Sequence, residues 1–209
     1  MTSDEPGNTG RASLGFLPRV LEEFAFLSSD LGFRLTQQSD TRVRYETDRR
    51  FVNVYHGRGS YELGVELGRW MQVEGETREE IFPLRNLLAL DHDLSELGYS
   101  GLTATTPTLV RKFVQRLAVW TRTFATNPLT DGDAIFDRAR ERNAAWSQSY
   151  LEGIRASRLR ARADEAWHRK DFAIVVDAYE EIASELTTVA LKESERARLT
   201  YAMKTLPGG

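Results

Sequence analysis

Two carboxylates, Glu62 and Glu66, are the acids of this sequence whose spacing first suggests catalysis. They stand on the same side of a strand-like run that begins at Tyr61. Four strand positions separate them by roughly 13 Å, whereas the paired acids of glycosidases stand only about 5 to 9.5 Å apart. The sequence therefore predicts no acid-pair catalysis here.

The other residue types that could do chemistry are equally scattered. Asp91, His92 and Asp93 are potential metal ligands, but consecutive loop residues rarely converge on one ion. His56 ends a strand-like run and is predicted to cap a hairpin. The absence of cysteine excludes disulfides, thiolate catalysis and cysteine-ligated metals. Because no acid, base, nucleophile and metal ligand come together, we predict a protein with no catalytic residues, metal or cofactor.

Composition narrows the class of protein. With 209 residues, 41% hydrophobic and 28% charged, the chain is typical of globular proteins. A net charge of -3 argues against nucleic acid as a partner. No segment approaches the roughly 18 apolar residues that a membrane span requires. We therefore expect a cytoplasmic protein without membrane contact.

The chain is predicted to have three regions: a flexible leader over residues 1–13, an α+β domain over 14–128 and a helical region over 129–209. The domain opens with a helix that has Pro18 in its first turn and stops at Gly32. Strand-like runs follow at 33–38, 42–46, 51–56 and 61–68. The predicted fold class is α+β, with a helix on a four-stranded antiparallel meander, then further helices and a C-terminal helical hairpin.

The three loops between these strands, SDT, TDRR and GRGS, predict the register. They place Val43 beside Val54, Val54 beside Leu63, and Gln37 beside Val43. The strands then share one apolar face, which the first helix could cover. That face comprises Phe33, Leu35, Val43, Tyr45, Val52, Val54, Leu63, Val65 and Leu67.

The opposite face combines aromatic rings with opposed charges, which is typical of a directional protein interface. In the predicted register Glu66 lies beside Phe51, and Glu62 beside Tyr55. An alternative is that the downstream helix, with Leu109 to Phe124 on its apolar stripe, covers this face and turns Phe51 and Tyr55 into core. The predicted partner-binding residues are Arg42, Arg44, Phe51, Asn53, Tyr55, Glu62 and Glu66.

Helices are predicted beyond a polar bridge at 71–80. A short one begins near Pro83, and a longer one runs from Thr106 until Asn127-Pro128 ends it. Thr130 with Asp133 resembles a capping box that opens another helix. Ile135, Ala139, Trp146, Tyr150 and Ile154 recur along that helix near helical spacing, and a break is expected around Gly153.

The last third predicts a helical hairpin that turns near Lys170-Asp171 and a final helix over 194–206. Its second helix resembles that of a tetratricopeptide repeat at Val175, Tyr179 and Ile182, although Arg162 and Thr187 depart from the family pattern. A basic patch is predicted to pair with acids of neighbouring helices rather than with nucleic acid. That patch consists of Arg155, Arg158, Arg160, Arg162, Arg169 and Lys170.

The segments DLGFRL, TRVRYE and FVNVYHGRGSYELGVELGR resemble small bacterial proteins encoded beside polymorphic toxins, the immunity type. The resemblance implies a cytoplasmic protein that acts by binding another protein. We therefore predict a non-enzymatic protein-binding module, an immunity or antitoxin-like inhibitor of a neighbouring gene product. The alternative is a scaffold or assembly subunit that docks or oligomerises through its C-terminal helices.

Overall fold

The computed structural model describes residues 9–130 and 132–206. The chain forms two compact units, Met1–Ala139 and Arg140–Gly209. The division lies inside helix α6 (Asp133–His168), eleven residues beyond the predicted domain boundary at 128. Residues 133–139 belong to the first unit because Phe136 and Ala139 are buried in its core.

The first unit contains a five-stranded antiparallel sheet in the order β1-β2-β3-β4-β5. Its strands are β1 (Arg34–Gln38), β2 (Arg42–Glu46), β3 (Arg50–His56), β4 (Leu63–Val73) and β5 (Glu76–Pro83). The predicted class is confirmed, with one more strand than expected. The extra strand comes from the predicted polar bridge, which is a hairpin whose two turn residues, Glu74 and Gly75, both have positive φ.

The predicted alignment of β2 with β3 is confirmed at Val43 opposite Val54 and at Tyr45 opposite Val52. The β1 alignment starts as predicted, with Leu35 opposite Tyr45, but a bulge shifts it by one residue. The prediction that Gln37 lies beside Val43 is therefore wrong, and Gln38 occupies that place. The bulge absorbs one extra residue in the edge strand.

The predicted alignment of β3 with β4 is wrong by two residues. Val54 pairs with Val65, and Leu63 pairs with His56. The turn is displaced from the predicted GRGS by one residue, because the Gly57 amide donates to the carbonyl of Glu62, 2.8 Å away. A shift of two residues keeps every side chain on its predicted face. It does change which residues lie opposite each other, so that Glu66 lies beside Asn53 instead of Phe51.

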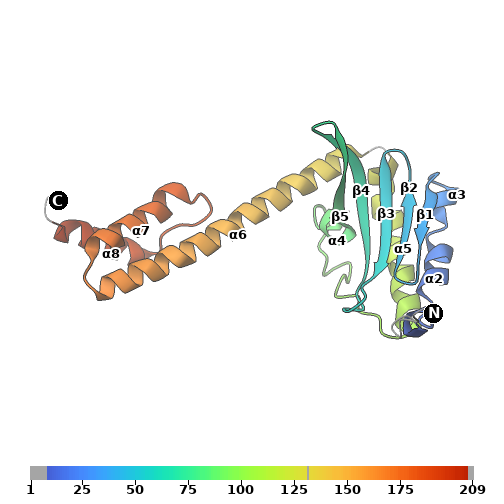
Figure 1. The fold of residues 1–209 in the computed structure, drawn as a ribbon, viewed down its shortest axis with the longest axis horizontal. Coiled ribbons are helices and arrows are strands. Elements are labelled where there is room, and N and C mark those ends of the chain that lie inside the picture. Colours follow the sequence, from blue (N-terminus) through green and yellow to red (C-terminus); the bar gives the residue numbers. More distant parts are fainter. Residues whose placement is uncertain (1–8, 131, 207–209) are drawn as a thin grey trace, which may run out of the picture. The chain divides into compact units, whose positions relative to one another are not determined.

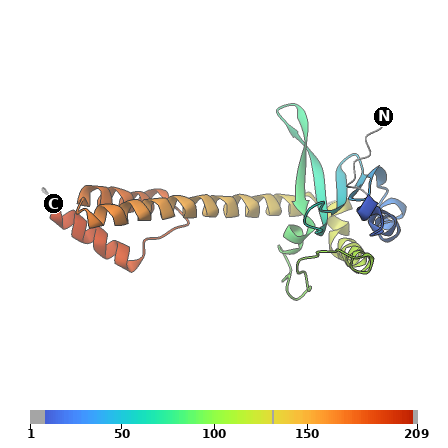
Figure 2. The same cartoon turned by 60° about the horizontal axis from the view of Figure 1, so that its bottom comes forward.

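One face of the sheet packs against helices (Figures 1 and 2). These helices include α2 (Phe16–Glu23), α4 (Leu84–Leu88) and α5 (Pro107–Thr130). Leu117 of α5 and Val20 of α2 share a core with the inward residues of β2, β3 and β4. The predicted apolar face is buried throughout except at Leu35, which is 40% exposed on the edge strand. The alternative in which α5 covers the opposite face is wrong.

The N-terminal helix is divided into α2 and α3 (Phe26–Ser29) instead of running unbroken to Gly32. The interruption turns both Phe24 and Phe26 into the core, which a regular helix would direct to different sides. Most of the predicted leader, residues 1–8, lies outside the described residues. Residues 9–12 form helix α1 (Thr9–Ala12).

Helix α5 begins at Pro107 as predicted but continues past Pro128 to Thr130. The prediction that Asn127-Pro128 ends the helix is wrong, because burial of Leu129 favours another turn. The Thr130 hydroxyl donates to carbonyls of α5, so the predicted capping box is not formed. The expected break at Gly153 is also absent, and α6 is continuous across it.

The second unit packs α6 against α7 (Phe172–Glu185) and α8 (Glu193–Thr205), as the predicted hairpin and final helix require. Small residues on one side of α6, including Ala156 and Ala163, allow close packing. Val175, Tyr179 and Ile182, the residues of the predicted repeat-like pattern, are buried in this core. The Asp171 side chain accepts from the Ile174 amide at the start of α7.

Candidate protein-binding surfaces

The sheet face opposite the helices, here called the outer sheet face, collects the predicted partner-binding residues. Arg42 lies opposite Tyr55, and Arg44 lies opposite Asn53. Asn53 in turn lies opposite Glu66 and donates to its carboxylate at 3.1 Å. Glu62 precedes β4 and forms an isolated bridge with Thr103 at the end of this face.

Two glycines of β4 hold two aromatic rings of β3 flat on the outer sheet face. Gly68 lies opposite Phe51, and a Cβ at residue 68 would come within 2.0 Å of the Phe51 ring. Gly64 lies opposite Tyr55, where a Cβ would come within 2.4 Å of the ring. Because neither glycine has a side chain, the rings lie across β4 instead of projecting from the sheet.

Arg44 covers the Phe51 ring. Its guanidinium carbon is 4.1 Å from the ring centroid, and Trp70 lies on another side of Phe51 with ring centroids 5.2 Å apart. The guanidinium donates to both carboxylate oxygens of Glu79 in β5, at 2.9 and 3.3 Å, and also pairs with Glu46. This pairing satisfies the charge of a side chain that is only 7% exposed.

The centre of the outer sheet face is therefore closed by its own side chains. Phe51 and Asn53 have no exposed surface. Arg44, Phe51 and Asn53, predicted to touch a partner, instead form a buried layer that supports the residues around them. Tyr55, Glu66 and Arg42 stay partly exposed, and Glu62 is exposed.

A polar cleft of about 400 Å³ opens where β1 ends, β2 begins and β3 ends. Three predicted residues, Arg42, Tyr55 and Glu66, line it. The Arg42 Nε is buried and has no hydrogen-bond partner among the described residues. The rest of the lining consists of Gln37, Ser39, Thr41, His56, Gly57 and Arg58.

One wall of this cleft, the loop at 57–62, is fixed by Arg11. The Arg11 guanidinium donates to the carbonyls of Gly57, at 3.0 Å, and Arg58. It also lies over the Tyr61 ring, 3.9 Å from its centroid. Arg58 itself is exposed and adds a second positive charge at the cleft.

Tyr55 gives the cleft a neutral hydrogen-bond donor. Burial raises the pKa of its phenol, and the negative charges of Glu62 and Glu66 raise this pKa further. The phenol therefore stays protonated at neutral pH. Guanidinium, phenol and carboxylate groups thus lie close together. A partner surface with complementary charges would fit this combination in one orientation.

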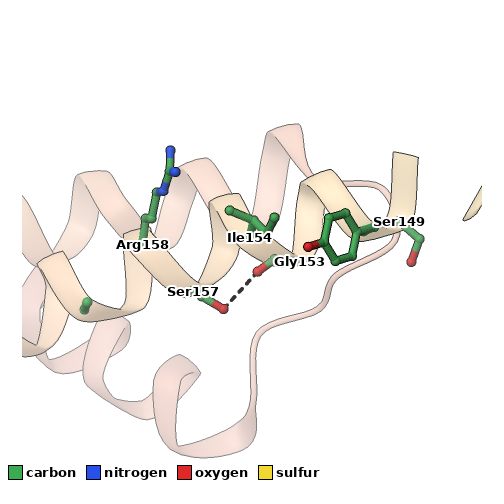
Figure 3. Close-up of a pocket in the computed structure, with 7 residues that line it drawn as sticks. Ser149, Gly153, Ile154, Ser157 and Arg158 are labelled. Carbon is green, nitrogen blue, oxygen red and sulfur yellow. Dashed lines mark hydrogen bonds between the residues drawn. The ribbon is translucent and has the colours of Figure 1, made fainter. Parts of the chain in front are cut away.

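The second unit has a different kind of exposed surface, on α6. Trp146 is 67% exposed and Tyr150 57% exposed, and their rings stack with centroids 5.5 Å apart. A shallow hollow of about 520 Å³ lies beside Tyr150, and Figure 3 labels five of the residues around it. Its lining is Ser149, Tyr150, Gly153, Ile154, Ser157, Arg158 and Ala161.

Most residues of the predicted basic patch pair with acids, as predicted. Arg155 binds Glu181 and Glu185 of α7. Arg160 binds Glu195 of α8, at 2.7 Å. Arg162 and Arg169 are also paired, with Asp177 and Glu165. These ion pairs place four of the six patch residues beside acids of the same unit.

The remaining sequence candidates have structural partners. Asp91 pairs with Arg138 of α6, and the Asp93 carboxylate accepts from the Ser95 amide. The Nε2 of His56 lies 2.9 Å from the Ala104 carbonyl, and burial lowers the pKa of this imidazole. In residues 9–130 and 132–206 no three His, Asp or Glu residues converge as a metal site would require. None of the helices described there is long and apolar enough to cross a membrane.

Four contributors to these surfaces are not predicted from the sequence: Arg11, Arg58, Trp70 and Glu79. Glu79 lies on the unrecognised strand β5, so its contact with Arg44 could not be inferred. The glycines were a usable signal, because Gly64 and Gly68 recur four positions apart on a strand that follows aromatic residues. No protein-family model, curated protein or solved structure matches this chain.

Proposed function

We propose that this protein is a non-enzymatic module that binds another protein through the polar cleft of the outer sheet face. The observation that carries the proposal is Arg42. Its Nε is buried without a hydrogen-bond partner among the described residues, at a cleft that is open to solvent. A buried unsatisfied cationic donor is costly, and a partner's acceptor would remove that cost.

Comparison with other arginines of the sheet supports this interpretation. Arg44 pairs with Glu46 and Glu79, and Arg69 pairs with Glu80 among others. Both are buried guanidiniums whose carboxylates come from the same chain. Arg42 is only partly buried as a residue, but its Nε is buried and has no such carboxylate among the described residues. We infer that the missing carboxylate belongs to an Asp or Glu of the partner.

The charges around the cleft set the orientation of that partner. Arg42 and Arg58 would face its acids, while Glu62 and Glu66 would face its basic groups. Charges arranged in this way contribute mainly to specificity and to the rate of association. Such a surface suits an inhibitor that must find one target, as the resemblance to immunity-type proteins implies. The proposed target is the product of a neighbouring gene.

The affinity for that product tests the proposal. We expect Arg42→Glu and Glu62→Arg each to weaken binding about tenfold or more, since each places like charges in contact. Arg34→Glu is the matched control, because Arg34 is an exposed arginine on β1 whose pair with Asp48 is also exposed. Isothermal titration calorimetry on purified full-length proteins measures the effect. Unchanged affinity in both Arg42→Glu and Glu62→Arg would remove the outer sheet face as the binding surface.

A second candidate function is favoured by a different observation. Trp146 and Tyr150 are large aromatic side chains exposed on α6, and such residues are enriched where proteins associate. They support a scaffold or assembly subunit that docks through its C-terminal helices. Light scattering on the full-length protein separates the two functions, because only assembly through α6 requires an oligomer in the absence of a target.

A further inference from the structure

The α6 segment of the second unit carries an apolar surface that nothing in the described chain covers. Every residue from 140 to 151 is exposed, and among them Trp146, Tyr150 and Leu151 are 67%, 57% and 64% exposed. Helical segments without tertiary packing are marginally stable in water. Exposed aromatic pairs on such a segment indicate a binding surface.

The residues that follow on the same side of α6 are small. Gly153 and Ser157 succeed Trp146 and Tyr150 along one helical stripe, at the spacing of three and four residues that places side chains on one face. A Cβ at Gly153 would meet nothing within 4 Å. Figure 3 shows the Ser157 hydroxyl turned back to the Gly153 carbonyl, which it donates to at 2.9 Å. Large side chains thus occupy the first half of the stripe and small ones the second half.

We propose that this stripe binds the same stripe of a second copy of the chain, with the two α6 helices antiparallel. In the coiled-coil register of that pairing, Trp146 packs on Ser157 of the other copy and Tyr150 packs on Gly153. Each large side chain then meets a small one, in four consecutive layers related by a two-fold axis. A parallel pair would instead place Trp146 against Trp146 and leave Gly153 facing Gly153.

The core of the second unit leaves this stripe available. Ala156, Leu159 and Ala163 of α6 face α7 and α8. At 100° per residue these positions lie on the side of α6 opposite Tyr150 and Ser157. Tyr150 and Ser157 therefore stay outside the core of the second unit.

Light scattering and sedimentation equilibrium on the full-length protein test the proposal. We expect a dimer for the natural sequence. Gly153→Leu should abolish the dimer by filling the space for Tyr150, and it should leave the monomer folded because residue 153 has open space and leucine favours helix. Trp146→Ala should weaken dimerisation at least about 30-fold. Leu151→Ala is the control, since Leu151 is as exposed but lies on another side of α6.

Circular dichroism verifies that each variant keeps its helices. A cysteine at residue 157 tests direction, because the chain has no other cysteine. Antiparallel pairing separates the two copies of residue 157 by roughly 16 Å along the helices, so Ser157→Cys should form no disulfide-linked dimer on mild oxidation. Efficient cross-linking would overturn the antiparallel arrangement.

The inference rests on the second candidate function and not on the cleft. Arg42→Glu should leave the dimer intact, and Gly153→Leu should leave target binding intact, so the two proposals fail separately. A monomer at all accessible concentrations, or a dimer that Gly153→Leu does not disturb, would overturn the assignment of this stripe to a second copy.

Discussion

At the scale of single residues, Gly64 and Gly68 show how a strand accepts a residue that disfavours strands. Glycine in a strand interior costs about 0.5 to 1 kcal/mol relative to alanine. Burial of a phenylalanine side chain returns about 1.5 to 3 kcal/mol, and at Gly68 the Phe51 ring is buried because there is no Cβ beneath it. The aromatic contact therefore outweighs the intrinsic cost of the glycine.

This balance makes Gly68→Ala informative. Intrinsic strand propensity predicts that the substitution raises the free energy of unfolding, whereas packing predicts that it lowers it. We expect the free energy of unfolding to fall by about 1 to 3 kcal/mol, because the new methyl group collides with the Phe51 ring. Gly59→Ala, where a Cβ meets nothing within 4 Å, is the control. Urea unfolding measures both variants. An additional Phe51→Leu substitution should restore part of the loss, and an unaltered or raised stability of Gly68→Ala would show that the ring does not depend on the glycine.

His56 gives a residue-scale prediction for pH. Burial lowers the pKa of its imidazole, and the nearby Arg11 charge lowers this pKa further. The unfolded chain then binds a proton more readily than the folded one. The contribution of His56 to the free energy of unfolding is therefore complete above the unfolded pKa and is lost as the pH falls below that value. The decline in unfolding free energy below pH ~6.5 should have a slope of at most about 1.4 kcal/mol per pH unit from this group.

Replacement by glutamine removes that titration but keeps a donor for the Ala104 carbonyl. The His56→Gln protein should therefore show a flatter stability profile between neutral and mildly acidic pH. His168→Gln, at an exposed position, removes a different imidazole and serves as the control. Parallel profiles for His56→Gln and the natural protein would exclude His56 as the titrating group.

At the scale of elements, the sequence predicts the structure where a hydrophobic pattern repeats. It does not predict polar contacts between residues that are far apart in the chain. Alternation in β2 and β3 predicts their faces and alignment because a slip of one residue would expose Val43 and Val54. A slip of two residues conserves the pattern, so alternation could not exclude the erroneous pairing of Val54 with Leu63. Strand β5 carries charged residues at four of its eight positions and has no such alternation.

The candidate site likewise has a part that the sequence predicts and a part that it does not. The seven predicted residues do gather on or beside one face, since that depends on alternation alone. Their accessibility was not predictable, because the burial of Arg44 and Phe51 depends on Glu79 and on a glycine that admits the ring. The exposure of Trp146 was likewise unpredictable, because helical spacing does not tell whether a neighbouring helix covers the stripe.

The N-terminus of α6 is tied to the sheet by ion pairs. Asp133 accepts from Arg50 at 2.6 Å and from Arg69 at 3.0 Å, and both guanidiniums are buried. We expect Asp133→Asn to lower the free energy of unfolding by about 1 to 2 kcal/mol, a value reduced by the half-exposure of this carboxylate. Asp48→Asn should change it by less than about 0.5 kcal/mol, because the pair between Asp48 and Arg34 is exposed.

The pH dependence supplies a further check on that pair. Arg69 holds the pKa of Asp133 below its ordinary value. The stabilisation is therefore present above the unfolded pKa and is lost as the pH falls through the folded one. The difference between the natural protein and Asp133→Asn, measured by urea unfolding, should shrink on acidification below pH 4. A difference that stays constant would assign the effect to the amide substitution itself.

At the scale of the whole molecule, the two units have separate cores. The core of the first includes Leu67 of β4 and Val20 of α2, and the core of the second includes Ile182 of α7 and Ala163 of α6. No described residue belongs to both clusters. Separate cores make the two proposed activities independent, since target binding uses the first unit and self-association the second.

This separation predicts that a core substitution destabilises the unit that contains it and leaves the other unit unchanged. Leu67 and Ile182 are both fully buried, and truncation of either to alanine should cost about 2 to 5 kcal/mol through lost burial and the cavity left behind. We expect Ile182→Ala to accelerate amide hydrogen exchange across 156–205 and to leave strands β2 to β4 unchanged. Leu67→Ala should do the reverse, which makes each variant the control for the other under native conditions. Faster exchange throughout the chain in either variant would show one cooperative unit, and target binding and self-association would then rise and fall together with stability.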